Sequence, residues 1–206
     1  EVGSGDGLFS FYLADRYSVN VTGLELNAIE ATACQHLAAQ RSRRNLHFVG
    51  GRLEDQPWTE QFDLVYCLDV LEHVPDDVGL LVHMRKVLKP SGRLLVHVPN
   101  RHYLDTDRVL RTVPDEAAWK VNPGHVRAGY TPDELSDVLT RAGYRVDTVQ
   151  ATQGLPIAWA HRLHLWAEKR LPLRLLILPL IDVLTFIDRC RPPAHGNTLW
   201  ALAHKA

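Results

Sequence analysis

The stretch Glu1-Val2-Gly3-Ser4-Gly5-Asp6-Gly7 decides the fold, because it is a glycine-rich loop followed by a plausible helix from Leu8 to Leu13. Glycines at a strand-to-helix turn let a ligand approach the backbone closely, since no Cβ intervenes. The dinucleotide fingerprint G-x-G-x-x-G would place a third glycine where this chain has Leu8. Glycine-rich turns also close ordinary α/β units, so the loop alone does not identify a ligand.

An acidic residue follows the loop at a spacing that suits nucleoside-like ligands. The buried strand expected over Val19 to Glu25 ends in a carboxylate, 25 − 7 = 18 residues after Gly7. A carboxylate at this position can accept both hydroxyls of a ribose. The loop and the acid together therefore predict a site for a ribose-containing ligand, which neither feature predicts alone.

Beyond the loop, apolar runs alternate with helical patterns. Strands are expected over residues 19–25, 46–49, 62–68, 93–98, 144–149 and 197–203, and helices over 27–41, 76–88 and 131–143. Asn27 and Glu30 are expected to form a capping box at the first of these helices, and Thr131 and Glu134 at the last. The expected fold is α/β: a Rossmann-like open, mostly parallel twisted sheet with helices on both faces and a final antiparallel strand.

Length, charge and cysteine content disfavour several classes of protein. The 206 residues, 46% hydrophobic and 23% charged, suit one globular domain of generous size. The 23 basic and 24 acidic side chains nearly cancel, which argues against a protein whose main task is to bind nucleic acid. Cys34, Cys67 and Cys190 lie far apart in the sequence, so neither a disulfide framework nor a cysteine zinc site is expected. The same spacing favours a cytoplasmic location.

Several motifs in order give the chain a resemblance to a known family. From residue 1 to about 149 it resembles the class I S-adenosylmethionine-dependent methyltransferases of the small-molecule group, and it is similar to ubiquinone-type O-methyltransferases. The motifs are the glycine loop, Leu24-Glu25, Gly51 to Trp58, Phe62-Asp63-Leu64-Val65, Leu71-Glu72-His73-Val74, Leu88 to Leu94, and Gly124-His125-Val126-Arg127. The resemblance implies S-adenosyl-L-methionine as the cofactor and methyl transfer as the reaction.

The resemblance also implies a role for each cofactor-binding residue. Gly3, Gly5 and Gly7 would line the methionine part of the cofactor. Glu1 would steady the loop and the ammonium group, and Glu25 would hold the ribose hydroxyls. The remaining implied contacts are Leu26 packed on the adenine, the backbone amide of Leu53 offered to the adenine, and Cys67 with Leu68 as the pocket floor near the sulfonium.

One position departs from the family pattern. The family often has Asp after the glycine of the Gly51 to Asp55 stretch, where it accepts the adenine amino group. This chain has Arg52, a donor that cannot accept that bond. Either Glu54 or Asp55 substitutes for it, or packing alone holds the adenine.

Two histidines are the candidates for catalysis. Methyl transfer from a sulfonium needs mainly positioning and desolvation, and a base helps only where the acceptor is a hydroxyl. His73 is the first candidate, because it follows the strand that ends at Leu68 and should face the rim of the cofactor site. A structural turn with His73 bonded to backbone is the alternative. His125, like Tyr130, could line the acceptor pocket, and loop packing explains both equally well.

A metal is a further alternative at the same turn. Ubiquinone-type enzymes that resemble this stretch carry two carboxylates and a histidine that can hold a divalent ion, so Asp69, Glu72 and His73 could hold Mg or Mn. Many relatives share the sequence without using a metal, and carboxylates often only solvate a helix start. No metal is therefore assigned.

Two segments interrupt the regular pattern. Residues 99–130 are interpreted as a substrate-side insertion and residues 150–196 as a Leu-rich helical insertion. Within 155–189 the longest uncharged apolar run, Leu175 to Ile181, is too short to span a membrane, and Pro179 is expected to kink or break a helix. Its wide apolar face could pack on the domain, lie at a membrane surface or cover a substrate pocket.

The function expected from these observations is S-adenosylmethionine-dependent methyl transfer to a small acceptor. The acceptor could be lipid-linked, and the acceptor atom is expected to be oxygen rather than carbon or nitrogen. The alternatives are a non-catalytic methyltransferase-fold binding module, motivated by Arg52, and a nicotinamide-dependent oxidoreductase, disfavoured by Leu8. Residues 1–206 are expected to form a single methyltransferase domain that is truncated at its N-terminus. No nucleic-acid partner is expected, peripheral membrane contact through 155–189 is considered, and the oligomeric state stays open.

Overall fold

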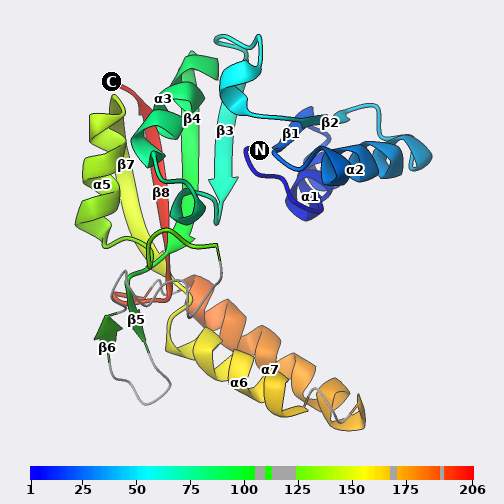
Figure 1. The fold of residues 1–206 in the computed structure, drawn as a ribbon. Helices are drawn as coiled ribbons and strands as arrows, with labels where there is room; N and C mark the ends of the chain where they lie inside the picture. The colour runs from blue at the N-terminus through cyan, green and yellow to red at the C-terminus, as the bar shows by residue number, and fades with distance from the viewer. Residues whose placement is uncertain (105–109, 113–123, 168–170, 191–192) are drawn as a thin grey trace.

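The structure, a computed structural model, describes residues 1–104, 110–112, 124–167, 171–190 and 193–206. Strands and helices alternate along the chain as the sequence predicts (Figure 1). The helices are α1 (Leu8–Tyr17), α2 (Ala28–Gln40), α3 (Asp77–Val87), α5 (Pro132–Arg141), α6 (Leu155–Ala167) and α7 (Leu171–Cys190). The strands are β1 (Val21–Glu25), β2 (Leu46–Gly50), β3 (Phe62–Leu68), β4 (Leu88–Pro99), β5 (His102–Leu104), β6 (Leu110–Thr112), β7 (Tyr144–Thr152) and β8 (Thr198–Lys205). Single 3-10 turns lie at Leu53–Asp55 and Leu71–His73.

The central sheet has two parts that meet at one residue. β1 pairs in parallel with β2, and β3 pairs in parallel with β4. Val2 forms parallel bridges to both Leu24 in β1 and Cys67 in β3, so it joins the two parts. β8 lies between β4 and β7 and runs antiparallel to both. The mostly parallel sheet with an antiparallel last strand is thus confirmed.

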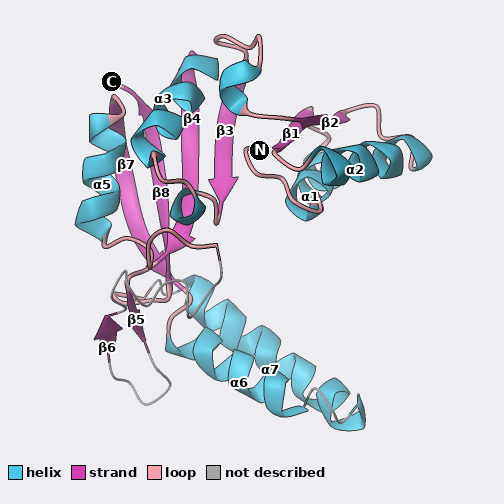
Figure 2. Ribbon diagram, viewed as in Figure 1, coloured by secondary structure: helices cyan, strands magenta, loops and turns pink. Residues whose placement is uncertain are grey.

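Strand alternation gives the larger part of the sheet one core face. Leu94, Val96 and Val98 of β4 belong to the same buried cluster as Leu81 of α3 and Leu135 of α5. Helices α3 and α5 cover that face (Figure 2). Because side chains alternate along a strand, the residues between these, such as His97, point to the other face.

The smaller part of the sheet has a core of its own. α1 and α2 pack beside β1 and β2 and contribute to a second, smaller buried cluster. Phe11 of α1 and Phe48 of β2 form its aromatic contact, with ring centroids 5.6 Å apart. This unit carries the glycine loop at its edge, where Gly7 precedes the first residue of α1.

The helix caps agree with the sequence in one case and differ in the other. Thr131 and Glu134 form the predicted capping box at α5. At α2, the Asn27 side chain accepts from the Ile29 N–H, but Glu30 bonds the side-chain amide of Asn27 and does not return the bond to its backbone. The reason is that the Asn27 N–H already donates to Glu25.

The two segments predicted as insertions contain hairpins. β5 and β6 pair antiparallel within residues 99–130, much of which lies outside the described residues. Within residues 150–196, α6 and α7 form a helical hairpin that projects from the rest of the molecule (Figure 1). The expected break at Pro179 is wrong, because α7 continues through this residue, which removes only one backbone donor while α6 lies alongside. Among the described residues, no helix is both long and apolar enough to cross a membrane.

Candidate functional site

The glycine loop turns through left-handed backbone and leaves one stretch of main chain open. Gly3 and Gly5 have φ angles of +74° and +50°. A Cβ at Gly3 would lie 2.5 Å from Cγ2 of Val70, a clash that only glycine avoids. At Gly5, no described atom comes within 4 Å of where a Cβ would be. A ligand can therefore lie directly against the backbone at Gly5.

Glu25 lies at the other side of this opening and is bonded to it. Its Oε2 accepts the Gly5 N–H at 2.8 Å, and its Oε1 accepts the Asn27 N–H at 3.0 Å. A carboxylate offers about four lone-pair positions. Two backbone donors therefore leave acceptor capacity for the two hydroxyls of a ribose, and the structure brings together the loop and the acid that the sequence pairs.

Glu1 and Gly7 lie where the loop joins α1. The Glu1 carboxylate accepts a hydrogen bond from the Ser10 hydroxyl in the first turns of α1, and Ser10 is fully buried. Burial raises the pKa of the Glu1 carboxyl, although the Ser10 hydrogen bond lowers it. Glu1 thus connects the loop to α1, and this connection would steady the loop. Its contact with an ammonium group stays a prediction.

The residues predicted for the adenine end follow the carboxyl ends of β1 and β2. Leu26 is 69% exposed beside the end of β1, and Leu53 is buried in the turn that follows β2. Arg52 forms an ion pair with Glu54, so that carboxylate is already engaged. Asp55 is exposed, and of the two substitutes predicted for the family's aspartate it is the one without that ion pair.

The predicted pocket floor lies at the end of β3. Cys67 is fully buried beneath the glycine loop, and burial raises the pKa of its thiol. Leu68, the next residue, lines a cavity described below. Cys67 therefore contributes packing, while Leu68 is the one of the pair that reaches accessible space.

The predicted metal trio is not the group that the structure brings together. The ligand atoms of Glu72, His73 and His125 lie within 4.8 Å of one another. Asp69 does not join them, because its carboxylate is paired with His97. One carboxylate with two imidazoles suits a borderline cation such as Zn²⁺ better than Mg²⁺, which prefers oxygen ligands.

Within this group Glu72 has an unusual environment. Its side chain is 1% exposed, and among the described residues neither carboxylate oxygen has a hydrogen-bond partner. Burial, together with the nearby charge of Asp69, raises the pKa of Glu72 to about 7.

The two candidate catalytic histidines are in contact. The rings of His73 and His125 meet edge to face, with centroids 4.5 Å apart. His73 Nδ1 lies 3.0 Å from the Gly124 carbonyl, the backbone bond that the alternative interpretation anticipates. Burial, and secondly the neighbouring His73, lower the pKa of His125.

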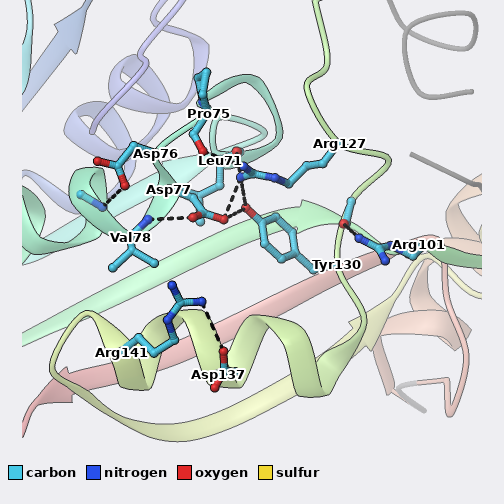
Figure 3. A network of polar contacts seen from close by, with 12 residues as sticks. Leu71, Pro75, Asp76, Asp77, Val78, Arg101, Arg127, Tyr130, Asp137 and Arg141 are labelled. Atoms are coloured by element: carbon cyan, nitrogen blue, oxygen red, sulfur yellow. Dashed lines mark hydrogen bonds and ion pairs between the residues drawn. The ribbon is translucent and has the colours of Figure 1, made fainter. Parts of the chain in front are cut away.

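Tyr130 belongs to a polar network with Arg127 and Asp77 (Figure 3). Its hydroxyl donates to Asp77 Oδ2 at 2.7 Å and accepts from Arg127 Nη1 at 2.6 Å. Arg127 also pairs with Asp77 at 2.7 Å and donates to the carbonyls of Leu71 and Pro75. The network ties residues 124–130 to the turn before α3, so it supports the loop-packing account of Tyr130.

A cavity of about 500 Å³ lies at the carboxyl ends of β3, β4 and β7 and the facing end of β8, beside the base of the α6–α7 hairpin. Its walls include Phe9, Leu68, Asp69, His97, Gln150 and Trp200. The sequence reasoning missed His97 and Trp200. The signal for His97 was present: it is a polar residue on the non-core face of an alternating strand, close to that strand's carboxyl end.

Comparisons with known proteins agree with this architecture. Residues 1–96 match the family described as "Methyltransferase domain". The chain is 31% identical over 122 residues to a ubiquinone biosynthesis O-methyltransferase of Hydrogenovibrio crunogenus, an overlap of 55% of this chain and 50% of the relative. A protein of the same name from Marinobacter nauticus is 29% identical over 175 residues, 79% of this chain and 70% of the relative.

A solved structure shares the fold at low sequence identity. The Haemonchus contortus phosphoethanolamine N-methyltransferase 2, determined in complex with S-adenosyl-L-methionine, superposes with a TM-score of 0.71. It is 15% identical, and the overlap covers 99% of this chain and 47% of that chain. The chain thus spans about half the length of this structure and of the Hydrogenovibrio relative.

Proposed function

The chain carries a class I S-adenosylmethionine-dependent methyltransferase domain, and from this premise we propose that it transfers the methyl group of S-adenosyl-L-methionine to an oxygen atom of a small acceptor. The observation that carries the proposal is the junction of Gly5 and Glu25. Open backbone and a carboxylate with spare acceptor capacity lie side by side there, at the carboxyl ends of adjacent parallel strands.

The chain's own residues have distinct tasks in this proposal. The cofactor supplies an activated methyl group on a sulfonium, which is already a good electrophile. Gly3, Gly5 and Gly7 would hold its methionine part against the main chain, and Glu25 would fix its ribose. Leu26 and Leu53 would enclose the adenine, and Leu68 would bound the space in which the acceptor lies. Positioning of this kind is the main contribution a protein makes to methyl transfer.

Binding of the product S-adenosylhomocysteine tests the cofactor assignment without any knowledge of the acceptor. Calorimetric titration should detect binding to the wild-type chain. Glu25→Gln removes a charged acceptor, and its loss should weaken binding by roughly 10- to 150-fold, the equivalent of about 1.5–3 kcal/mol. Asp63→Asn is the matched control, because this exposed carboxylate near the start of β3 pairs with Lys89, away from the loop. Absence of binding to the wild type at high micromolar ligand would contradict the proposal.

Oxygen is favoured as the acceptor atom for two reasons. The curated relatives named above are O-methyltransferases by name. A hydroxyl acceptor must also lose a proton, and the structure offers imidazole groups at the carboxyl edge of the sheet. His73 and His125 are the two that the sequence predicts for this region, and they remain candidates for contact with the acceptor.

An apolar, lipid-linked acceptor is supported by the exposed side chains of α7. Leu180, Val183, Phe186 and Ile187 are exposed on the projecting hairpin, with Phe186 exposed by 66%. Exposed apolar side chains gathered on one helix mark a contact surface. The base of the same helix reaches the cavity through Thr185 and Asp188. The hairpin could therefore meet a membrane surface while its base borders the acceptor space.

Flotation with liposomes tests this part of the proposal separately. The chain should rise with vesicles of phosphatidylethanolamine and phosphatidylglycerol, and the double variant Val183→Glu with Phe186→Glu should lose most of that binding, because charges cannot enter the apolar layer. Thr185→Glu is the control, since it adds a charge to the polar side of the same helix. Equal flotation of all three proteins, or none for the wild type, would count against membrane contact through 155–189.

A further inference from the structure

Three neighbouring strands place a row of side chains along one wall of the cavity. His97 of β4 is paired in register with Trp200 of β8, and Trp200 is paired with Gln150 of β7. All three line the cavity of about 500 Å³. The rings of His97 and Trp200 are in contact, with centroids 4.5 Å apart. The wall is therefore an aromatic ring with an imidazole on one side and an amide on the other, a surface that suits a planar ligand with polar substituents.

Asp69 makes two contacts with His97, one through its side chain and one through its backbone. Asp69 Oδ1 lies 2.9 Å from His97 Nδ1, and the Asp69 N–H donates to the His97 carbonyl at 3.0 Å. Asp69 reaches this position with a φ of +53°, a left-handed conformation that non-glycine residues adopt at a cost. The backbone at the end of β3 is thus bent in a way that points a carboxylate at an imidazole on the next strand.

This arrangement determines which nitrogen of His97 is available. A carboxylate 2.9 Å from Nδ1 favours the tautomer that carries its proton on Nδ1, and Nε2 then carries a lone pair. Within the described part of the chain, the side-chain contacts of His97 are those with Asp69 through Nδ1 and with the ring of Trp200, which leaves Nε2 without a hydrogen bond there. His97 is 8% exposed, so its ring is fixed by packing as well as by Asp69. An oriented imidazole beside a ligand-sized space is the geometry of a general base.

We propose that the cavity is the acceptor site, that the acceptor is a phenol-type hydroxyl compound, and that His97 takes its proton while Asp69 positions the imidazole. This inference rests on the proposed function and names the base for it. Phe9, which follows the glycine loop, and Leu68 line the same cavity, so the acceptor site borders the place proposed for the cofactor.

The proton and electron balance of the step is simple. The acceptor O–H bond breaks and its proton goes to His97 Nε2, while the oxygen forms a bond to the methyl carbon. The carbon–sulfur bond of the sulfonium breaks, and its electron pair stays on sulfur as a neutral thioether. The imidazolium pairs with Asp69 and then releases its proton to water. Asp188 is the other titratable group that lines the cavity, and it is engaged in accepting the Gly154 N–H at 2.9 Å.

The strength of the base indicates the class of acceptor. A phenol has a pKa of about 10, whereas an aliphatic alcohol is a far weaker acid, close to water. A neutral imidazole therefore takes a proton from a phenol far more readily than from an aliphatic alcohol. The aromatic wall of Trp200 and Phe9 suits the same class, because aromatic rings stack at short range.

The probe for this inference is 4-nitrophenol, whose phenolate is yellow and whose neutral form is nearly colourless. Absorbance during a pH titration, with saturating S-adenosylhomocysteine and excess protein, reports whether the bound hydroxyl has lost its proton. Wild-type protein should lower the apparent pKa of the bound phenol by about one unit, a tenfold gain in its ionisation constant. His97→Gln should bind the probe without that shift, and Asp69→Asn should show a smaller shift than the wild type.

A matched histidine controls for general effects of the substitution. His204 Nδ1 lies 2.9 Å from Asp147 Oδ1, the same kind of pair, but His204 is paired in register with Arg93 near the opposite end of β8. His204→Gln should therefore retain the full shift.

The outcomes separate this inference from the proposed function. S-adenosylhomocysteine binding is measured on the same samples, and its absence from the wild type contradicts the proposed function. If that ligand binds but 4-nitrophenol does not, or if the probe ionises equally with the wild type and with His97→Gln, the assignment of His97 and of a phenol-type acceptor is overturned.

Discussion

Glu72 is the residue whose surroundings depart furthest from what its chemistry prefers. A carboxylate with no partner inside a protein is costly, and the usual response is to hold a proton. Its raised pKa, about 7, has that cause. The same side chain lies against His73 and His125, so the proton that it holds and a cation at this group would compete for one carboxylate.

The raised pKa predicts how stability depends on pH. Because the folded pKa of Glu72, about 7, exceeds the value of 4.5 for an unperturbed glutamate, folding favours the protonated form. The free energy of unfolding should therefore fall as pH rises between about 4.5 and 7, by at most about 1.4 kcal/mol per unit of pKa difference. Glu72→Gln cannot ionise and should lose less stability than the wild type between pH 5 and pH 8.

Urea unfolding in EDTA at the two pH values measures this difference, since EDTA removes any cation from the histidines. Glu60→Gln is the control, because that carboxylate is about half exposed and pairs with Lys205. If the wild type and Glu72→Gln lose the same stability between pH 5 and pH 8, Glu72 is already charged in the folded protein.

The sequence predicted those site residues whose placement depends on local geometry. Gly5 and Glu25 follow from a turn and from the spacing to the next strand, and the structure brings them together. The partner of Asp69 depends on which strand lies beside β3 and on which face each side chain takes. Glu72 is only three positions after Asp69 in the sequence, but the adjacent strand β4 brings His97 closer to the Asp69 carboxylate. A motif read along one segment cannot contain that information.

At the scale of elements, the Arg127 network determines where residues 124–130 lie. Arg127 and Asp77 are both largely buried, and their ion pair is bonded to Tyr130 and to two backbone carbonyls (Figure 3). The network spans from the segment before α5 to the first turn of α3, which are distant in sequence. It holds His125 close to His73, because both histidines lie on the two segments that it joins.

Removal of the Arg127 guanidinium should therefore lower the free energy of unfolding substantially. Arg127→Met removes the cation paired with the largely buried Asp77 and the donor to the Tyr130 hydroxyl, and loss of one partner from a buried pair costs about 3 kcal/mol. Arg141→Met is the matched control, because its pair with Asp137 is exposed and 3.6 Å long, and such pairs contribute about 0.5 kcal/mol or less. Urea unfolding at pH 7 compares the two variants. Equal losses would show that the Arg127 network does not stabilise the fold.

The elements also show where pattern reasoning reaches its limit. Periodicity and capping signals predicted α5 well, because Thr131, Pro132 and Glu134 act within one turn. The predicted break at Pro179 is wrong in α7, since one missing donor is tolerated when a neighbouring helix packs along the same length. Packing against α6 determines whether α7 continues through Pro179, and the sequence around Pro179 contains no information about that packing.

At the scale of the whole molecule, the sheet is divided into two parts with unequal cores. β1 and β2 share a small cluster with α1 and α2, while β3, β4, β7 and β8 share a much larger one with α3 and α5, to which Leu24 of β1 also belongs. Within the described residues, Val2 alone carries the strand pairing between the two parts. The part with the smaller core has less buried apolar area to hold its amides closed.

Hydrogen exchange should therefore resolve two cooperative units. Amides in β1, β2, α1 and α2 should open with a lower free energy than those in β3, β4 and β8, because the buried cluster of the first unit is the smaller one. Native-state exchange monitored by mass spectrometry at increasing urea measures both values. A single opening free energy for all of these amides would mean that the two parts unfold together. Saturation with S-adenosylhomocysteine should raise the lower value towards the higher one, since the glycine loop and Leu68 lie on different units.

The antiparallel β8 has a consequence for how the protein is made. The strand between β4 and β7 comes from residues 198–205, so during synthesis both neighbours leave the ribosome long before the strand that separates them. Until then β4 keeps an unpaired edge, which other nascent chains or chaperones can meet. Trp200, one wall of the cavity, arrives with the same strand. A chain whose synthesis stops at residue 190 would thus contain the glycine loop but lack the strand that forms one wall of the cavity.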